Sequence, residues 1–234
     1  GVVSCLRADN LGDEPVLFVE GEGFMRGGKQ DRLVTRSAIL APRSFGIIPV
    51  VCTQWDRWID HSREFVPGSF CPPFLRCLLK EGRALPGNQP RVRRTNRENH
   101  DFSSTWWRVC NLSRAVEMNK DWLDELRMRI PCAEGATGIA VCAGDKVVCL
   151  DVFNDSATLA KIWDRFNRGI TLDALEIPGR GEQASILDVM LRACEMMDFP
   201  WQEIESVGMG REYIAEDRHG GIASAVVMDG VVVH

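Results

Sequence analysis

The residue types most suited to chemistry lie together between residues 21 and 32, in the stretch GEGFMRGGKQDR. Glycines let the backbone approach a ligand closely, and backbone N–H groups together with cations attract an anion. We therefore expect a glycine-rich loop, held between two strands, that binds phosphate or carboxylate groups. The expected ligand-binding residues of this loop are Gly27, Gly28, Lys29, Gln30 and Arg32.

The same stretch carries one carboxylate, Glu22, that could accept a hydroxyl proton or act as a general base. Arg26 and Arg36 extend the positive charge along the chain. The simpler alternative is a glycine-rich hairpin whose charged side chains are only solvated. The glycine spacing matches neither a Walker loop nor a dinucleotide-binding fingerprint, so the sequence leaves both interpretations open.

A second candidate stretch, CTQWDRW at residues 52–58, combines a cysteine with two tryptophans and an arginine. Arg57 and Trp58 can clamp an anion and stack on a planar ring, so we expect both to bind ligand. The alternative is a strand end whose tryptophans pack into the core. Cys52 could be a nucleophile only beside a base or a cation, and His61, the nearest histidine in sequence, has no evident reason to face it.

Asp151 is a carboxylate inside the apolar run VCLDVF. A buried carboxylate must be paired, so Asp151 either meets a cation such as Arg32 or Arg57 or caps the helix that follows, and capping is favoured. If the chain is an enzyme, Asp151 and Glu22 are its expected acid–base groups. Residues 208–213, GMGREY, offer another group of glycines, a cation and a carboxylate that could join the first loop.

These residues must be positioned by the surrounding elements, which predict an α+β fold. Strands at 2–7, 16–20, 33–40 and 45–52 predict an antiparallel, β-rich N-terminal half that forms a sandwich or a curled sheet. Pro49 indicates an edge strand or a bulge. Prolines and glycines then break the pattern, leaving at most a short helix at 74–80. The basic residues between 91 and 101 could form a lid over an anionic ligand, but a solvated loop is favoured.

The C-terminal half mixes strands and helices. We expect helices at 113–130, at 181–197 and after a cap at Asn154 or Ser156, with Leu159, Ile162, Trp163 and Phe166 on one face of the last of these. A hairpin is expected at 138–141 and 146–152, and strands at 205–214, 222–228 and 231–233. The chain therefore divides into a β-rich part (1–58), an irregular connection (59–112) and an α+β part (113–234), which together are expected to form one compact unit.

Composition excludes several classes of protein. A chain of 234 residues can bury about 70% of its unfolded surface without metal or disulfide support. A net charge of −5 argues against a general nucleic-acid or membrane binder, because such proteins need excess cations. No apolar stretch is long enough to span a bilayer and no export signal is recognisable, so we expect a cytoplasmic protein. Nine cysteines without a Cys-x-x-Cys pair predict reduced thiols and no zinc site.

Several short motifs occur in a specific order along nearly the whole chain. They are Gly21-Glu22, Gly27-Gly28-Lys29-Gln30 with Arg32, Ile48-Pro49-Val50 with Cys52, Arg57-Trp58, and Asp151-Val152-Phe153 followed by Thr158-Leu159 and Trp163. With these motifs the chain resembles the ADP-ribosylglycohydrolase- and rhodanese-phosphatase-associated protein domain family.

The resemblance implies a domain without an established activity, whose neighbours handle ADP-ribose or other nucleotide-derived compounds. The expected function is binding, with or without chemical processing, of a phosphorylated compound of that kind. The alternatives are a hydrolase or transferase on the same compounds and a protein-interaction module, with any cofactor unknown and a homo-oligomer left open. One departure from the family pattern is Gln54, which replaces a glutamate and cannot act as a base.

Overall fold

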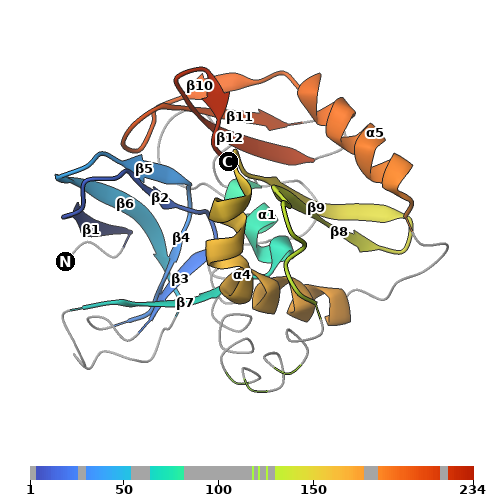
Figure 1. Ribbon diagram of the computed structural model, residues 1–234, viewed down its shortest axis with the longest axis horizontal. Helices are drawn as coiled ribbons and strands as arrows, with labels where there is room; N and C mark the ends of the chain where they lie inside the picture. The colour runs from blue at the N-terminus through green and yellow to red at the C-terminus, as the bar shows by residue number, and fades with distance from the viewer. Residues whose placement is uncertain are drawn as a thin grey trace, which may run out of the picture.

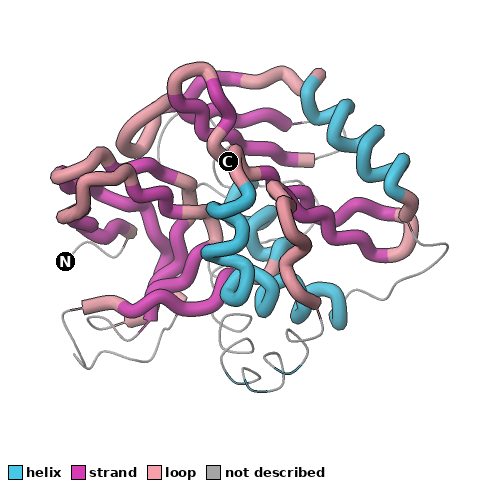
Figure 2. The backbone as a smooth tube through the Cα atoms, viewed as in Figure 1, coloured by secondary structure: helices cyan, strands magenta, loops and turns pink. Residues whose placement is uncertain are grey.

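The computed structural model describes residues 4–25, 30–53, 64–81, 118, 121, 125, 130–176, 184–216 and 221–234. Within these residues strands are mostly antiparallel and dominate the N-terminal half, whereas helices lie mainly in the C-terminal half (Figure 2). The predicted α+β class is therefore confirmed.

The N-terminal half is built from two antiparallel sheets, drawn in blue and cyan in Figure 1. The larger sheet has the strand order β1-β6-β4-β3-β7, and the smaller sheet pairs β2 with β5. Their bounds are β1 Cys5–Asn10, β2 Val16–Phe18, β3 Glu22–Met25, β4 Arg32–Val34, β5 Ala38–Leu40, β6 Ser44–Cys52 and β7 Val66–Phe70.

The glycine-rich stretch is a hairpin connection and not a long loop. Its first third is strand β3, which pairs antiparallel with β4, so only residues 26–31 connect the two strands. Residues 26–29 lie outside the described residues. The strand predicted at 33–40 is likewise two strands, β4 and β5, and residues 35–37 between them leave the sheet.

Two prolines were interpreted wrongly from the sequence. Pro49 does not mark an edge: it lies in β6, between β1 and β4, one residue before pairing with β4 begins at Val50. Its carbonyl accepts the N–H of Thr35, the residue after β4, so the position that lacks an N–H lies just past the β4 ladder. Pro67 was interpreted as part of an irregular connection, yet it lies in β7, which among the described strands pairs with β3 alone and so forms an edge, where a proline is tolerated.

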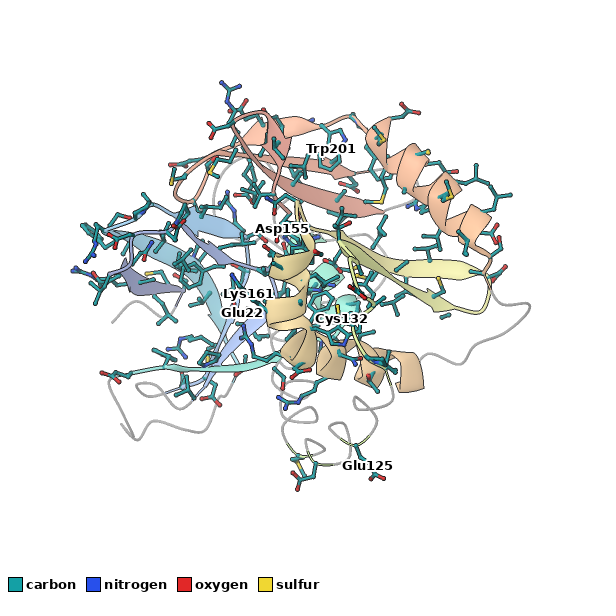
Figure 3. The ribbon with its side chains drawn as sticks, viewed as in Figure 1. Glu22, Glu125, Cys132, Asp155, Lys161 and Trp201 are labelled. Carbon is teal, nitrogen blue, oxygen red and sulfur yellow. The ribbon has the colours of Figure 1, made fainter. Side chains whose placement is uncertain are left out.

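The predicted helices and hairpin that follow are confirmed. The short helix is α1 (Pro73–Glu81), the hairpin pairs β8 (Gly138–Ala143) with β9 (Lys146–Val152), and the next helix is α4 (Ser156–Glu176). The predicted cap of α4 was wrong by one residue, because the carboxylate of Asp155 accepts the Thr158 N–H at 2.8 Å (Figure 3). Of the helix predicted at 113–130, residues 118, 121, 125 and 130 are described; the first three are helical, and residue 130 is a bend beyond the helix.

The last part of the chain adds helix α5 (Ile186–Met197) and a four-stranded antiparallel sheet. The sheet runs β10-β11-β12-β13, with β10 Gln202–Ile204, β11 Arg211–Glu216, β12 Ile222–Met228 and β13 Val231–Val232. A single strand at 205–214 was wrong, because Gly208 and Gly210 adopt positive φ angles and separate β10 from β11. The apolar side chains expected to pack from α5, among them Ile186 and Met190, are exposed.

Helix α4 is the central element that joins the N-terminal sheets to the rest (Figure 1). Its Phe166 ring packs edge-on against Phe70 of β7, with 5.0 Å between ring centroids, and against Phe153 after β9. A separate apolar cluster lies within the N-terminal half, between the two sheets, and includes Val34 and Ile48. The confirmed apolar face of α4 thus fills the main core.

Residues 208–213 do approach the N-terminal half, as predicted, but they reach β5. Gly208 forms a bridge with Ile39, and the Met209 N–H donates to the Ile39 carbonyl at 2.7 Å. The contact between Gly208 and the Ile39 carbonyl leaves no room for a side chain. Glycine at position 208 therefore allows the C-terminal sheet to dock on the N-terminal half.

The close packing of α4 on β7 yields a stability prediction. A β-carbon at Gly169 would lie 2.5 Å from the Phe70 carbonyl oxygen, so Gly169→Ala should destabilise the protein by about 1–3 kcal/mol. Helix propensity alone predicts the opposite sign, about 1 kcal/mol of stabilisation. Urea unfolding would measure the difference, with the exposed Ala160→Gly in the same helix as the control that calibrates propensity. A more stable Gly169→Ala variant would contradict the packing.

Candidate functional site

A group of ionisable side chains lies buried or half-buried where the N-terminal sheet meets α1, α4 and β9. We call it the charged cluster. It includes three carboxylates, three cations and one histidine, namely Glu20, Glu22, Asp151, Arg76, Lys80, Arg165 and His234. Removing charges from water is costly, and such clusters are typical of functional sites. Figure 3 shows Glu22 near the centre of the molecule.

The turn between β2 and β3 brings two glutamates into the cluster. Gly21, between Glu20 and Glu22, has φ +85°, and its backbone bonds to Val34 and Cys71 hold the turn against the sheet and the start of α1. A side chain at position 21 would collide with the side chain of Arg76, at 2.5 Å from its Cδ. Glycine is therefore required here by backbone conformation and by space.

Arg76 of α1 and Asp151 of β9 form a buried, two-pronged ion pair. The two guanidinium nitrogens lie 2.5 and 2.6 Å from the two carboxylate oxygens. Burial alone would raise the pKa of Asp151, but the charge and hydrogen bonds of Arg76, assisted by His234, hold this pKa well below its usual value. Asp151 is thus a permanent carboxylate. The favoured prediction that it caps the following helix was wrong, because Asp151 is paired with Arg76, which was not among the predicted cations.

Cys149 shares a strand face with Asp151, two residues away, and its sulfur lies 3.0 Å from the carboxylate. Arg76 also contacts this sulfur, at 2.9 Å. Burial raises the pKa of Cys149 well above its usual value, and the positive charge of Arg76 offsets this only in part. Cys149 is therefore a neutral thiol that completes the hydrogen bonding around the ion pair, and not an activated nucleophile.

Glu22 lies in a different electrostatic environment. Its carboxylate is 2.7 Å from Nη1 of Arg165 on α4, and the Val19 N–H donates to it at 3.4 Å. Burial raises the pKa of Glu22, and the opposing effects of Arg165 and Val19 do not cancel that rise. A carboxyl group with a raised pKa can carry a proton closer to neutral pH than an ordinary glutamate.

His234, the last residue of the sequence, closes the other side of the cluster. Its Nδ1 lies 2.9 Å from the hydroxyl oxygen of Ser37, and its Nε2 lies 3.4 Å from Oδ1 of Asp151. The imidazole stacks on the Phe153 ring, with 4.7 Å between centroids and 20° between planes. The histidine therefore connects the β4–β5 connection to the end of β9.

The described residues of the predicted loop site lie together, but apart from Glu22. Nη1 of Arg32 donates to the side chain of Gln30 and to the Asp31 carbonyl, both at 3.2 Å. Arg32 pairs with Phe24, so Glu22 lies two residues, about 7 Å, further along β3. The structure therefore separates Glu22, with Asp151, from the two described loop residues. The other expected ligand-binding residues, Gly27, Gly28, Lys29, Arg57 and Trp58, lie outside the described residues.

Arg36 is not a free extension of the cationic loop, because it binds a carboxylate. It forms two-pronged contacts with Glu212 of β11 and also contacts the Glu205 carbonyl. Its side chain is 23% exposed and that of Glu212 is 3% exposed. The pair of Arg165 and Glu22 is similar, at 24% and 10%, so the two Arg–Glu pairs form a natural comparison.

Sequence reasoning missed Ser37, Arg76, Arg165 and His234. Arg76 had one recognisable signal, a cation in the middle of the apolar run FLRCLL of the short helix, and Arg165 adjoins the apolar face of α4. Ser37 and His234 carried none, because they are 197 positions apart and adjoin only through folding. Among the described residues, no group of three or more His, Cys, Asp or Glu side chains could hold a metal ion.

Comparison with protein families matches residues 1–234 to the ARG and Rhodanese-Phosphatase-superfamily-associated Protein domain. The chain belongs to this family. The resemblance found from the sequence motifs is thereby confirmed over the full length. No curated protein and no solved structure matches this chain. In the part of the chain that the structure describes, no helix is long and apolar enough to cross a membrane.

The ion pair of Arg76 and Asp151 predicts a pH-dependent stability. Asp151→Asn leaves a buried, uncompensated guanidinium, which should lower the free energy of unfolding by about 3–5 kcal/mol at neutral pH. Because the folded-state pKa of Asp151 is lowered, its contribution is fully present above the ordinary value of 3.8 and is lost as the pH falls below it. The difference between wild type and variant should then narrow, by up to about 1.4 kcal/mol per pH unit.

Urea unfolding at neutral pH and at about pH 3 would measure this difference. The double variant Arg76→Met, Asp151→Leu is the control, because it removes both charges and should be more stable than Asp151→Asn. An Asp151→Asn variant as stable as the wild type at neutral pH would contradict the assignment, as would a difference that widens in acid.

Proposed function

We propose that this chain binds a phosphorylated, nucleotide-derived small molecule such as ADP-ribose. The observation that carries the proposal is the charged cluster, in which cations from α1 and α4 meet carboxylates from the β2–β3 turn and β9. Buried charge is expensive in a protein that needs only to fold, since well-packed apolar side chains stabilise as much or more. A binding site gives the chain a reason to maintain it.

The cations of the cluster differ in how they could meet a ligand. Arg76 is fully buried and held by Asp151, whereas Lys80 and Arg165 are half-buried and can exchange a carboxylate for a phosphate. Arg32 adds a buried Nε donor that no described residue accepts from. An anionic ligand would therefore lie along β3, between Arg165 at one end and Arg32 at the other.

The length of this strand suits a compound with two linked phosphates. The two ends of β3 lie about 10 Å apart, so a diphosphate at one end places a sugar near the other. In this arrangement Gly27, Gly28, Lys29 and Gln30 hold the phosphates, and Arg57 and Trp58 hold the ring. These assignments remain predictions from the sequence. The family name supports the class of compound by association only.

Titration calorimetry with ADP-ribose tests the binding proposal. We expect binding by the wild-type chain and an affinity lower by about tenfold or more in Arg32→Ala, because a charge-assisted hydrogen bond contributes about 1.5–3 kcal/mol. The matched control is Arg43→Ala, which removes an exposed arginine paired with Asp13 on the same half of the chain. The proposal fails if ADP-ribose and related nucleotides give no heat, or if both variants bind as the wild type does.

A second candidate function is hydrolysis or group transfer on the same compounds, with Glu22 as the acid–base group. The observation in its favour is the difference between two carboxylates: burial raises the pKa of Glu22, while Arg76 holds that of Asp151 low. Enzymes that use a proton donor and a carboxylate base commonly separate two pKa values in this way. Of the two predicted acid–base residues, Glu22 is the better proton carrier.

Turnover of a panel of nucleotide sugars tests this candidate. Glu22→Gln keeps the shape of the side chain and removes the proton transfer, which should lower kcat by about 10²–10⁴-fold with KM little changed. The matched control is Glu212→Gln, since Glu212 is also a buried carboxylate paired with a half-buried arginine. Equal loss in the two variants would indicate a structural role for both glutamates and would sink the assignment of Glu22.

A further inference from the structure

One further reactive group, the hydroxyl of Ser37 in the β4–β5 connection, adjoins the charged cluster at His234. The hydroxyl of Ser37 contacts Nδ1 of His234 at 2.9 Å, and Nε2 of His234 faces Asp151 at 3.4 Å. We propose that Ser37 is a nucleophile, activated by His234, with which the chain hydrolyses a carboxylic ester. This activity goes beyond the binding of a nucleotide and does not depend on it.

The hydrogen bonds around Ser37 fix where its proton points. Asp151 is a carboxylate that can only accept, so in the neutral imidazole Nε2 carries the ring proton toward it and Nδ1 is the acceptor. The Ser37 hydroxyl then donates its proton to Nδ1, while the Ser37 oxygen accepts the Glu20 N–H at 2.9 Å. This is the tautomer that a general base needs in order to take a proton from serine.

The imidazole is held from three directions. Phe153 stacks on its face, and the Val226 N–H donates to the His234 carbonyl at 2.7 Å. Asp151 accepts from one ring edge and is itself fixed by both prongs of Arg76. A catalytic base must be held within a fraction of an ångström of its working position, and this packing provides that restraint.

Water is the second reactant, so the overall reaction is hydrolysis of the ester. The Ser37 oxygen bonds to the ester carbonyl carbon, Nδ1 of His234 takes the hydroxyl proton, and the carbon–oxygen bond to the alcohol breaks as the alcohol receives that proton. Water then attacks the acyl-serine, gives its proton to Nδ1 and releases the carboxylic acid, which restores the Ser37 hydroxyl. No metal or redox partner takes part.

The burial of the pair limits the acyl group. Ser37 is 6% exposed and the His234 side chain 9% exposed, so little of either group is accessible to a substrate. We expect a short acyl group, such as acetyl, on a larger alcohol that stays outside. Exclusion of water also strengthens the electrostatic contacts that the reaction uses.

A small alkyl fluorophosphonate is the probe for this proposal, because an activated serine displaces its fluoride and keeps the phosphonyl group. Trypsin cleaves after Arg36 and Arg43 and gives the peptide SAILAPR, in which Ser37 is the one hydroxyl residue. We expect mass spectrometry of the labelled wild-type chain to find the adduct on this peptide. An unmodified SAILAPR peptide from the folded wild-type chain would overturn the proposal. This test does not depend on whether any variant folds.

His234→Gln should lower the labelling rate by about 100-fold or more, since it removes the base and keeps a polar side chain of similar reach. The matched control is Ser69→Ala, which removes another buried serine whose hydroxyl has no hydrogen-bond partner among the described residues. Hydrolysis of 4-nitrophenyl acetate should follow the labelling and should be lost in Ser37→Ala. Labelling that His234→Gln leaves unchanged would refute activation by the histidine.

Discussion

The ion pair between Arg76 and Asp151 is the contact on which the centre of this structure depends. It joins helix α1 to strand β9. Both side chains are buried, so each charge must be balanced by the other. Gly21, Cys149 and His234 are all arranged around it: the glycine leaves space for the arginine, the thiol contacts both partners, and the imidazole contacts Asp151. A buried pair of this kind contributes little net stability, so its main effect is to fix one arrangement of the elements that meet there.

Within this arrangement the two carboxylates suggested by the sequence have separate roles. Asp151 is ionised at any physiological pH and serves as a fixed negative charge. Glu22 is desolvated and is balanced by an arginine that remains half in contact with solvent, so its protonation state can respond to a ligand that competes for Arg165. The same residue type thus supplies a rigid anchor in one place and an adjustable group in another.

The elements set by local sequence patterns were predictable, whereas those set by pairing between distant strands were not. Helix α4, the β8–β9 hairpin and the β12–β13 turn at Asp229-Gly230 follow from periodicity and turn chemistry, which act over a few residues. Strands β3 and β7 were missed because they are rich in residues that usually break structure, yet each is stabilised by hydrogen bonds to a neighbour. Helix α5 was predicted correctly, but its apolar face is exposed, because an amphipathic pattern does not specify what the helix packs against.

The sequence by itself determined the α+β class, the family and the residues most suited to chemistry in the glycine-rich stretch, because composition, spacing and local motifs carry that information. The partners of those residues were decided only by the tertiary structure. Asp151 meets Arg76, Glu22 meets Arg165, and Ser37 meets a histidine at the far end of the chain. Electrostatic and hydrogen-bond partners act through space over a few ångströms, whereas sequence reports separation along the chain, and here folding brings together positions that are 75 to 197 residues apart.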